Sequence, residues 1–206
     1  GFTVKVISVI GLKGGSGKTW TAVPLAYEAS QRGTTVLLDL DPTLSATQWL
    51  EAADMTGERL MHAAPPLDGL TAAVRGLRAT GEVEYLVLDT PPVSREACML
   101  AAGQADLVVI PVHVGTGDLA QVVQTLDLLD MPRRANPKLE VRALLNHAGT
   151  MPAVTRETRA ALEGAGLTVV TTEIPSLRVY VTAKGTAPDG RWPHFAALWT
   201  EIEGLL

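Results

Sequence analysis

Short apolar runs of strand length alternate with amphipathic helical patterns along most of this chain. The apolar runs are rich in Val, Leu and Ile, which favour buried strands, and the segments between them space their apolar residues as helices do. The predicted strands cover residues 4–10, 35–40, 60–62, 85–88, 107–112, 141–145 and 167–170. The predicted helices cover residues 18–32, 44–53, 67–79, 94–103, 118–129, 153–164 and 193–205.

This alternation predicts βαβ units and therefore a doubly wound α/β fold, in which helices flank a mainly parallel sheet on both faces. The length of 206 residues fits a single domain, 1–206, better than two. Aromatic residues make up only 4% of the chain, so we expect a core of Val, Leu, Ile and Ala. Ligands bind beyond the carboxyl ends of the strands in such sheets, which points to the loops after Ile10, Leu38, Leu88 and Leu145.

A glycine-rich loop lies between the first predicted strand and the first predicted helix. Residues 11–19 read G-L-K-G-G-S-G-K-T. Its glycines let the backbone curl so that successive N–H groups point at a phosphate, and the helix that follows adds the positive end of its dipole. Lys18 supplies a charge for the β- and γ-phosphates, and the Thr19 hydroxyl is suited to Mg²⁺. The sequence therefore predicts a P-loop NTPase that binds ATP and Mg²⁺.

Two further strands deliver carboxylates toward the same edge. Residues 36–42 read V-L-L-D-L-D-P, and positions two apart on a strand face the same side, so both Asp39 and Asp41 can face the phosphates. The alternative is that these two aspartates cap the following helix. Residues 85–92 read Y-L-V-L-D-T-P-P, which resembles a Walker B motif, and Asp89 is expected to hold Mg²⁺ through a bound water.

The segment K-G-G-S-G-K-T, with a second lysine at Lys13, resembles the deviant Walker A motif of the ParA/MinD family of ATPases. The resemblance implies slow, partner-stimulated hydrolysis of ATP to ADP and phosphate. It also implies a homodimer in the ATP-bound state, in which Lys13 crosses the interface to the partner's nucleotide. The second aspartate of the family pattern, Asp41, would position the attacking water, and Asp39 would lie nearer the Mg²⁺ or the P-loop.

The similarity extends to later segments, with one departure. L-L-N-H at 144–147 and E-I-P-S-L-R-V-Y at 173–180 resemble family segments that hold the base, which gives Asn146 an adenine contact and Pro175 a covering role. The alternative for Asn146 is a turn residue at a strand end. Many relatives carry Thr or Ser where this chain has Trp20, whose N–H can still reach the α-phosphate while its side chain packs in the core or lies near the nucleotide.

These inferences define three sets of predicted site residues. The nucleotide-binding set is Lys13, Gly14, Gly15, Ser16, Gly17, Lys18, Thr19, Trp20, Asn146 and Pro175. The Mg²⁺ set is Thr19, Asp39 and Asp89, and the catalytic set is Lys13, Lys18 and Asp41.

The short length resembles the small plasmid type of ParA protein. That type implies non-specific DNA binding by the ATP dimer, a separate centromere-binding activator like ParB, and a role in plasmid or chromosome partition. The net charge of −5 and pI near 5.4 exclude a uniformly basic surface but leave room for local patches. Candidate DNA contacts are Arg133, Arg134, Lys138, Arg142, Arg156, Arg159, Arg178, Lys184 and Arg191.

Three alternatives to partition each require a feature of the sequence. A MinD-like role at a membrane or pole needs an anchor, but the helical segment 193–205 carries Glu201 and Glu203 where anchoring helices carry Lys and Arg, so we expect it to pack on the core. Iron–sulfur relatives need paired cysteines, and Cys98 is the only one. Metabolic ligases need a second substrate pocket, which the sequence does not reveal. With no signal peptide and no apolar run of about 20 residues, the expected location is cytoplasmic and not in the membrane.

Overall fold

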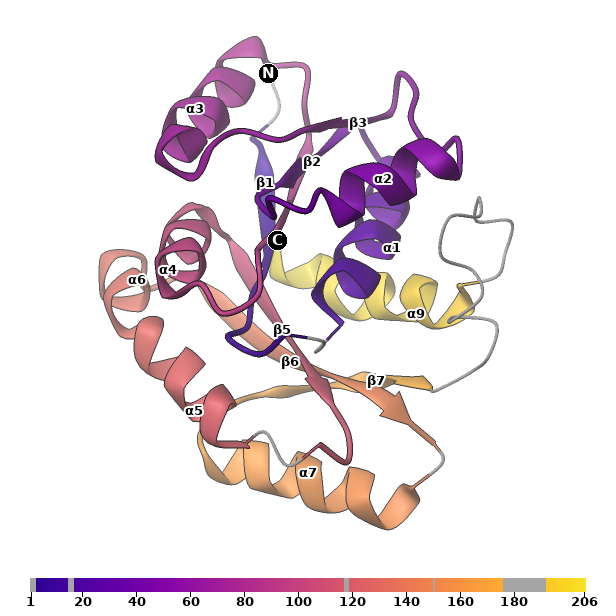
Figure 1. Cartoon of the computed structure of the whole chain (residues 1–206), viewed down its shortest axis with the longest axis vertical. Helices are drawn as coiled ribbons and strands as arrows, with labels where there is room; N and C mark the ends of the chain where they lie inside the picture. Colours follow the sequence, from indigo (N-terminus) through magenta and orange to yellow (C-terminus); the bar gives the residue numbers. More distant parts are fainter. Residues whose placement is uncertain (1–2, 15–16, 117–118, 150, 176–191) are drawn as a thin grey trace.

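Seven parallel strands form one sheet at the centre of the molecule, in the order β3-β2-β4-β1-β5-β6-β7 (Figure 1). The computed structural model describes residues 3–14, 17–116, 119–149, 151–175 and 192–206. The strands are β1 (Lys5–Val9), β2 (Thr35–Asp39), β3 (Leu60–Ala63), β4 (Tyr85–Asp89), β5 (Leu107–His113), β6 (Glu140–Ala148) and β7 (Val169–Pro175). Because β1 pairs with both β4 and β5, the loop that follows it emerges at the middle of the sheet.

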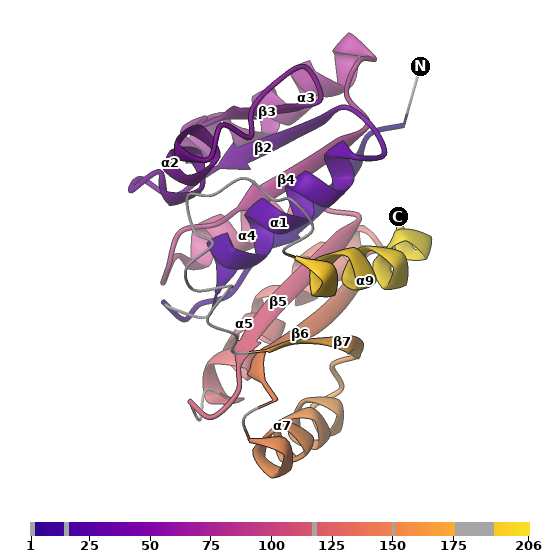
Figure 2. The same cartoon turned by 90° about the vertical axis from the view of Figure 1, so that its right-hand side faces the viewer.

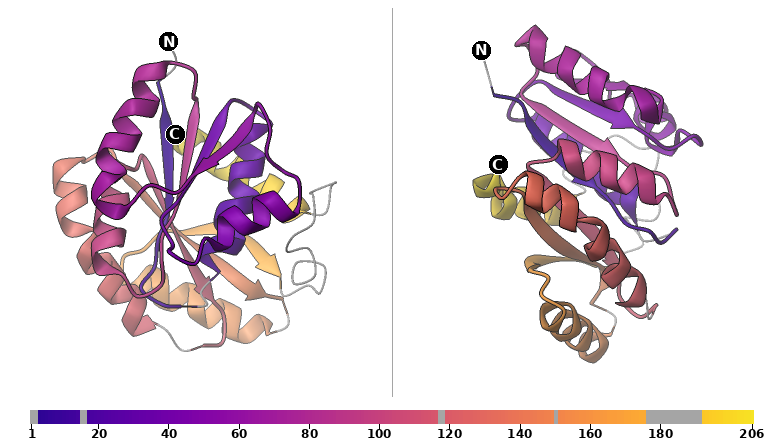
Figure 3. Two further views of the ribbon diagram at one scale, coloured as in Figure 1. Left: turned by 45° about the horizontal axis from the view of Figure 1, so that its top comes forward. Right: turned by 90° about the vertical axis from the view of Figure 1, so that its left-hand side faces the viewer.

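Helices cover both faces of this sheet. The helices are α1 (Lys18–Ser30), α2 (Ser45–Ala52), α3 (Leu70–Thr80), α4 (Arg95–Gln104), α5 (Leu119–Leu128), α6 (Asp130–Ala135), α7 (Pro152–Gly164) and α9 (Pro193–Ile202), with short 3₁₀ turns at Leu67–Gly69 and Glu203–Leu205. Helices α1, α2 and α9 pack on one face (Figure 2), and α3 to α7 pack on the other (the right-hand view of Figure 3).

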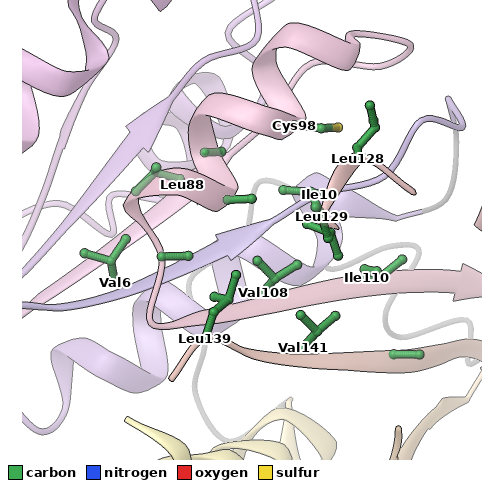
Figure 4. Packing of buried hydrophobic residues seen from close by; sticks show 14 of the residues in the cluster. Val6, Ile10, Leu88, Cys98, Val108, Ile110, Leu128, Leu129, Leu139 and Val141 are labelled. Carbon is green, nitrogen blue, oxygen red and sulfur yellow. The ribbon is translucent and has the colours of Figure 1, made fainter. Parts of the chain in front are cut away.

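Two apolar cores result, one on each side of the sheet. Strand β1 contributes to both, because its side chains alternate: Val6 joins the core under α4, whereas Ile7 and Val9 join the core under α1. Figure 4 shows part of the first core, where Cys98 lies among aliphatic side chains. Cys98 is fully buried on α4, where it packs as a small apolar side chain.

The predicted doubly wound α/β architecture is confirmed, and its errors are local. Helix α6 was not predicted, because its six residues include Pro132, which is tolerated in a first helical turn but lowers the helical signal. Strand β7 begins two residues later than predicted and runs on to Pro175, through Thr171 to Glu173, whose polar side chains hide an edge strand from a search for apolar runs.

The C-terminal helix α9 packs on the core as predicted. Phe195, Leu198, Trp199 and Ile202 are buried beside α1 and β7. On its polar side, the Glu201 carboxylate accepts hydrogen bonds from the backbone N–H groups of Thr171 and Thr172 on β7. Among the described helices, none has both the length and the apolar character needed to cross a membrane.

Candidate nucleotide site

The glycine-rich loop connects β1 to α1 and closes on one of its own lysines. The Lys18 ammonium group donates a hydrogen bond to the Lys13 carbonyl oxygen at 2.8 Å. Burial lowers the pKa of Lys18, and the nearby carboxylates of Asp89 and Asp41 oppose this shift. Gly14 is exposed, and Gly15 and Ser16 lie outside the described residues. The lysine charge is thus held inside the loop, where a phosphate would meet it.

The end of the loop packs against the end of β6. Gly17 has a φ of 95°, in the left-handed region that favours glycine. A Cβ atom added to Gly17 would lie 2.6 Å from Nδ2 of Asn146, which is buried. The structure therefore brings Asn146 to the predicted nucleotide loop, although 129 positions separate it from Gly17 in the sequence.

Thr19 and Asp89 meet on the other side of the loop. The Thr19 hydroxyl donates to Oδ2 of Asp89 at 2.8 Å. The second oxygen, Oδ1, is buried and has no hydrogen-bond partner among the described residues. Burial raises the pKa of Asp89 to about 7, although the Thr19 hydrogen bond opposes this shift. A hydroxyl and an orphaned carboxylate oxygen are hard oxygen donors of the kind Mg²⁺ prefers, so this corner fits the predicted ion.

Asp39 and Asp41 have different surroundings. Oδ1 of Asp39 accepts from the Asp41 N–H at 3.1 Å, and Oδ2 accepts from the backbone N–H and hydroxyl of Thr47 at 2.9 and 2.8 Å. Asp39 thus links the loop to helix α2 by hydrogen bonds. Its predicted place among the Mg²⁺ ligands stays a prediction, and these contacts do not favour it. Asp41 accepts a hydrogen bond from the Thr43 N–H at 2.9 Å and borders the cavity beside the loop.

That cavity has a volume of about 210 Å³ and joins all three predicted segments. Its wall consists of Gly17, Lys18, Thr19, Trp20, Asp41, Ser45, Thr90 and Pro92. The Thr90 hydroxyl donates to the Val9 carbonyl oxygen at 2.8 Å, which ties the Asp89 loop to the end of β1. The arrangement can neutralise phosphate charge with lysine and hold a water near a carboxylate, which are the two demands of phosphoryl transfer to water.

Comparison with known proteins gives the family. Residues 4–64 match a family model described as an AAA domain. The maintenance of carboxysome distribution protein A of Halothiobacillus neapolitanus is 31% identical over 182 residues, which is 86% of this chain and 82% of that protein. The chromosome-partitioning ATPase Soj of Thermus thermophilus is 31% identical over 170 residues, 69% of this chain and 68% of Soj. The chain belongs to the ParA/MinD family of P-loop ATPases.

Solved structures agree on the fold. The cell division ATPase MinD of Pyrococcus furiosus superimposes with a TM-score of 0.76 at 18% sequence identity, covering 99% of this chain and 100% of that one. As a member of the ParA/MinD family, the chain is an ATPase with ATP and Mg²⁺ as its ligands, as the sequence predicts.

Trp20, the departure from the ParA/MinD pattern, packs and also borders the cavity. Its ring centroid lies 4.8 Å from that of Trp49 on α2, at an interplanar angle of 60°. Both alternatives for its side chain therefore describe part of its position, because the ring joins the core under α1 and also forms part of the phosphate cavity.

The two residues predicted to contact the base, Asn146 and Pro175, lie at the ends of β6 and β7. Pro175 ends β7 and pairs with Ala148, next to Asn146 in the sheet. The predicted covering residues after Pro175 lie outside the described residues. The sequence did not single out His113 and His147, whose rings stack at 3.9 Å between centroids. Burial, followed by the charge of His113, lowers the pKa of His147.

A groove of about 680 Å³ adjoins the phosphate cavity and shares Asp41 and Pro92 with it. Its other lining includes Pro42, Pro65, Pro66 and Pro91. Beside it, Val93 is 75% exposed in a left-handed conformation, with a φ of 57°. No sequence signal pointed to this groove, because it is built from loops after three different strands.

Proposed function

We propose that this chain is an ATP-driven positioning switch. It dimerises on binding Mg·ATP, the dimer binds DNA without sequence preference, and stimulated hydrolysis releases it. The observation that carries this proposal is the single cavity in which Lys18, Thr19, Asp41 and the loop after Asp89 meet. Residues 1–206 act in this cycle as one ATPase domain.

Six residues in or beside the cavity have separate roles in this proposal. Lys18 exchanges the Lys13 carbonyl for the β- and γ-phosphates, and Lys13 extends to the nucleotide of the partner subunit in the dimer. Asp41, held by the Thr43 N–H, orients the attacking water, and Asp39 keeps that loop in place through Thr47. Thr19 and Asp89 would hold Mg²⁺, which supplies positive charge to the transferred phosphoryl group.

The nucleotide extends from this cavity toward the end of β6. The N–H groups of Gly14, Gly15, Ser16, Gly17 and Trp20 would receive the phosphates. Asn146, which already contacts the loop at Gly17, would reach the base, and Pro175 would cover it. This assignment is supported by the burial of Asn146 and by its pairing in the sheet with Ile174, the residue before Pro175.

DNA contacts are proposed at four exposed basic side chains. Arg133, Arg134, Lys138 and Arg156 are exposed. Two other candidates are engaged with acids, because Arg142 pairs with Glu140 at 2.8 Å and Arg159 with Glu173 at 3.0 Å. Arg178, Lys184 and Arg191 lie outside the described residues. We expect a separate, ParB-like activator protein to bind the ATP dimer and stimulate hydrolysis.

The cargo is proposed to be a plasmid or chromosome. The names of two relatives, Soj of Thermus thermophilus and ParA of Myxococcus xanthus, state chromosome partitioning for those proteins. A second candidate has a specific observation behind it. The relative with 82% of its length covered is named for carboxysome distribution, so the same switch would then distribute a protein complex. A MinD-like anchor at α9 is disfavoured because the apolar side chains of that helix are buried.

The test is DNA binding measured by fluorescence anisotropy on a labelled duplex of arbitrary sequence. Wild-type protein is compared with Mg·ATP and with Mg·ADP, and Asp41→Ala with Mg·ATP, from about 50 to 200 mM salt. We expect binding with ATP alone, a steep loss with salt, and retention in Asp41→Ala because hydrolysis is blocked. ATP-dependent dimerisation without DNA binding in any state would refute the partition switch.

A further inference from the structure

Four aromatic side chains form a continuous cluster between the phosphate cavity and the C-terminal helix. The aromatic cluster consists of Trp20, Tyr27, Trp49 and Trp192. Trp20 lies 4.8 Å from Trp49, Trp49 lies 5.7 Å from Trp192, and Trp192 lies 6.1 Å from Tyr27, measured between ring centroids. The contacts of Trp192 are edge-to-face, an arrangement that aromatic rings favour.

The cluster joins three helices on one face of the sheet, and two of them, α1 and α2, carry residues that line the cavity. Trp20 follows Thr19 directly on α1, and Trp49 lies on α2, which follows the Asp41 loop. Trp192 lies at the start of α9, after the segment that follows β7. Helices α1, α2 and α9 share one face of the sheet (Figure 2), so their relative positions depend on how these rings pack.

Helix α2 carries one wall of the cavity. Ser45, its first residue, borders the cavity together with Asp41 and Trp20. The helix is tied to the site by the Thr47 contacts to Asp39 and by the Leu44 N–H, which donates to the Asp41 carbonyl oxygen at 2.9 Å. Any shift of α2 would therefore displace the segment that carries Asp41.

The docking of α2 rests mainly on apolar packing. Trp49 is 2% exposed, and its indole N–H has no hydrogen-bond partner among the described residues. Its position is therefore set by what surrounds the ring, and Trp20 is the ring on the side of the cavity. On α1, Pro24 lacks the N–H that would bond the carbonyl of Trp20, so the turn after the phosphate loop has one backbone tie fewer.

We propose that Trp20 is a positioning residue for ATP hydrolysis. By packing against Trp49, it fixes the distance between α1 and α2 and thereby holds Asp41 at the γ-phosphate side of the cavity. This inference rests on the assignment of the cavity to the γ-phosphate. The family hydroxyl at this position is replaced by a ring that acts on the water-positioning loop through α2. Loss of the ring should lower the rate of hydrolysis more than the affinity for nucleotide.

The experiment compares Trp20→Thr, Trp20→Phe and a matched control, Trp199→Phe. Trp199 lies in the same core but packs against Tyr85, at 5.3 Å between centroids, on the sheet. The measurements are kcat for Mg·ATP hydrolysis and, separately, Kd for Mg·ATP by equilibrium binding. We expect Trp20→Thr to lose at least about 10-fold in kcat while Kd changes less than about 3-fold, since small misplacements of reacting groups cost large factors in rate. Trp20→Phe should restore most of kcat, and Trp199→Phe should match the wild type.

Tryptophan fluorescence supplies a second readout. In a Trp199→Phe background, three tryptophans remain, and all belong to the aromatic cluster. We expect Mg·ATP to change their emission, and Trp20→Thr to abolish that change while ATP still binds. Thr47→Val removes the hydroxyl contact between α2 and Asp39 and leaves the rings unchanged. It should lower kcat in the same way, and it replaces Trp20→Thr in the test if that variant does not fold.

Several results would overturn the proposal. An unchanged kcat in Trp20→Thr would remove any role for the ring in hydrolysis. A loss of about 10-fold or more in affinity at unchanged kcat would make Trp20 a direct nucleotide contact. An equal loss of kcat in the Trp199→Phe control would indicate a general effect of disturbing this core. Absence of ATP hydrolysis in the wild type would contradict the function of the site itself, before any variant is compared.

Discussion

Asp89 combines burial, a single hydrogen bond and an orphaned oxygen, so its carboxylate is poorly solvated without a cation. The unfolded-state pKa of an aspartate is near 3.8, and burial raises it to about 7 in the folded protein. The folded state therefore holds its proton more tightly, and stability is lost as the pH rises from the first value to the second. Above that window the full cost of a buried charge is present.

Replacing this charge should stabilise the protein without ligand. We expect Asp89→Asn to raise the free energy of unfolding by about 1–3 kcal/mol near pH 8, because it removes a buried, half-satisfied carboxylate. The gain should disappear below about pH 4, where Asp89 is protonated in both states. Denaturant unfolding at the two pH values measures it. The same variant should lose the extra stabilisation that Mg²⁺ adds to ATP; a variant that kept it would exclude Asp89 from the metal site.

Gly17 in the phosphate loop leaves little room for a side chain. Its φ of 95° and the 2.6 Å approach of Asn146 both oppose a side chain. We expect Gly17→Ala to abolish the shift in Tm that ATP causes, because the loop has to move to accept the methyl group. The double variant Gly17→Ala/Asn146→Ala removes the clash but leaves the backbone strain, and should recover only part of the shift. Full recovery of the ATP-induced shift in Tm would show that the backbone conformation of Gly17 is unimportant. No recovery would show that the contact with Asn146 is unimportant.

For single residues, the sequence motifs predicted the phosphate loop and the two loops that carry aspartates. Strand periodicity alone did not distinguish the two aspartates, whose separate roles are implied only by the family resemblance. In the structure β2 ends at Asp39, and Asp41 lies in the loop that follows. Thr47, eight positions after Asp39, donates its hydrogen bonds to Asp39. Such a contact depends on the direction in which α2 leaves the loop. That direction is set by the left-handed backbone conformation of Leu44, which cannot be predicted from the sequence because the residue is not a glycine.

Among the elements, β7 and α9 depend on each other. Strand β7 is an edge strand, and Glu201 on α9 covers the N–H groups of Thr171 and Thr172. Burial alone would raise the pKa of Glu201, but the hydrogen bonds from Thr172 and Thr171 outweigh it and lower the pKa. A carboxyl group with a lowered pKa stabilises the fold above its unfolded pKa and loses this effect as the pH falls through its folded value.

We therefore expect Glu201→Gln to lower Tm by about 2–4 °C at neutral pH, since an amide accepts these hydrogen bonds less well. The difference from the wild type should shrink in acid, where Glu201 is also neutral. Calorimetry at pH 7 and at about pH 2, well below the usual pKa of a glutamate, would check this. Glu203 follows the helix and has no such contact among the described residues, so Glu203→Gln is the matched control. An equal loss in both variants would assign the effect to net charge.

The elements that the sequence located correctly are those with strong apolar periodicity, such as β1, β4 and α1. Those that it missed or shifted, α6 and β7, are stabilised by their neighbours. Helix α6 follows α5 closely and buries little more than Pro132, and β7 gains its order from pairing with β6 and from Glu201. Tertiary context decides such elements, and local propensity carries little information about them.

On the scale of the whole molecule, the sheet order places the three chemical segments together. Strands β2, β4 and β1 are neighbours, so Asp39, Asp89 and the phosphate loop emerge side by side although 78 positions separate Gly11 from Asp89. The crevice rule for parallel sheets predicted this meeting point. It did not predict the adjoining groove, because loop shapes beyond the strand ends are not encoded in strand order.

The central claim is that ATP converts this chain from a monomer into a dimer. The most direct test is the solution mass by light scattering, for Asp41→Ala with Mg·ATP, with Mg·ADP, and for the double variant Lys13→Ala/Asp41→Ala with Mg·ATP. We expect twice the chain mass of 21.8 kDa for the first sample and the mass of one chain for the other two. A single-chain mass with ATP, at protein concentrations well above those that saturate nucleotide binding, would contradict it.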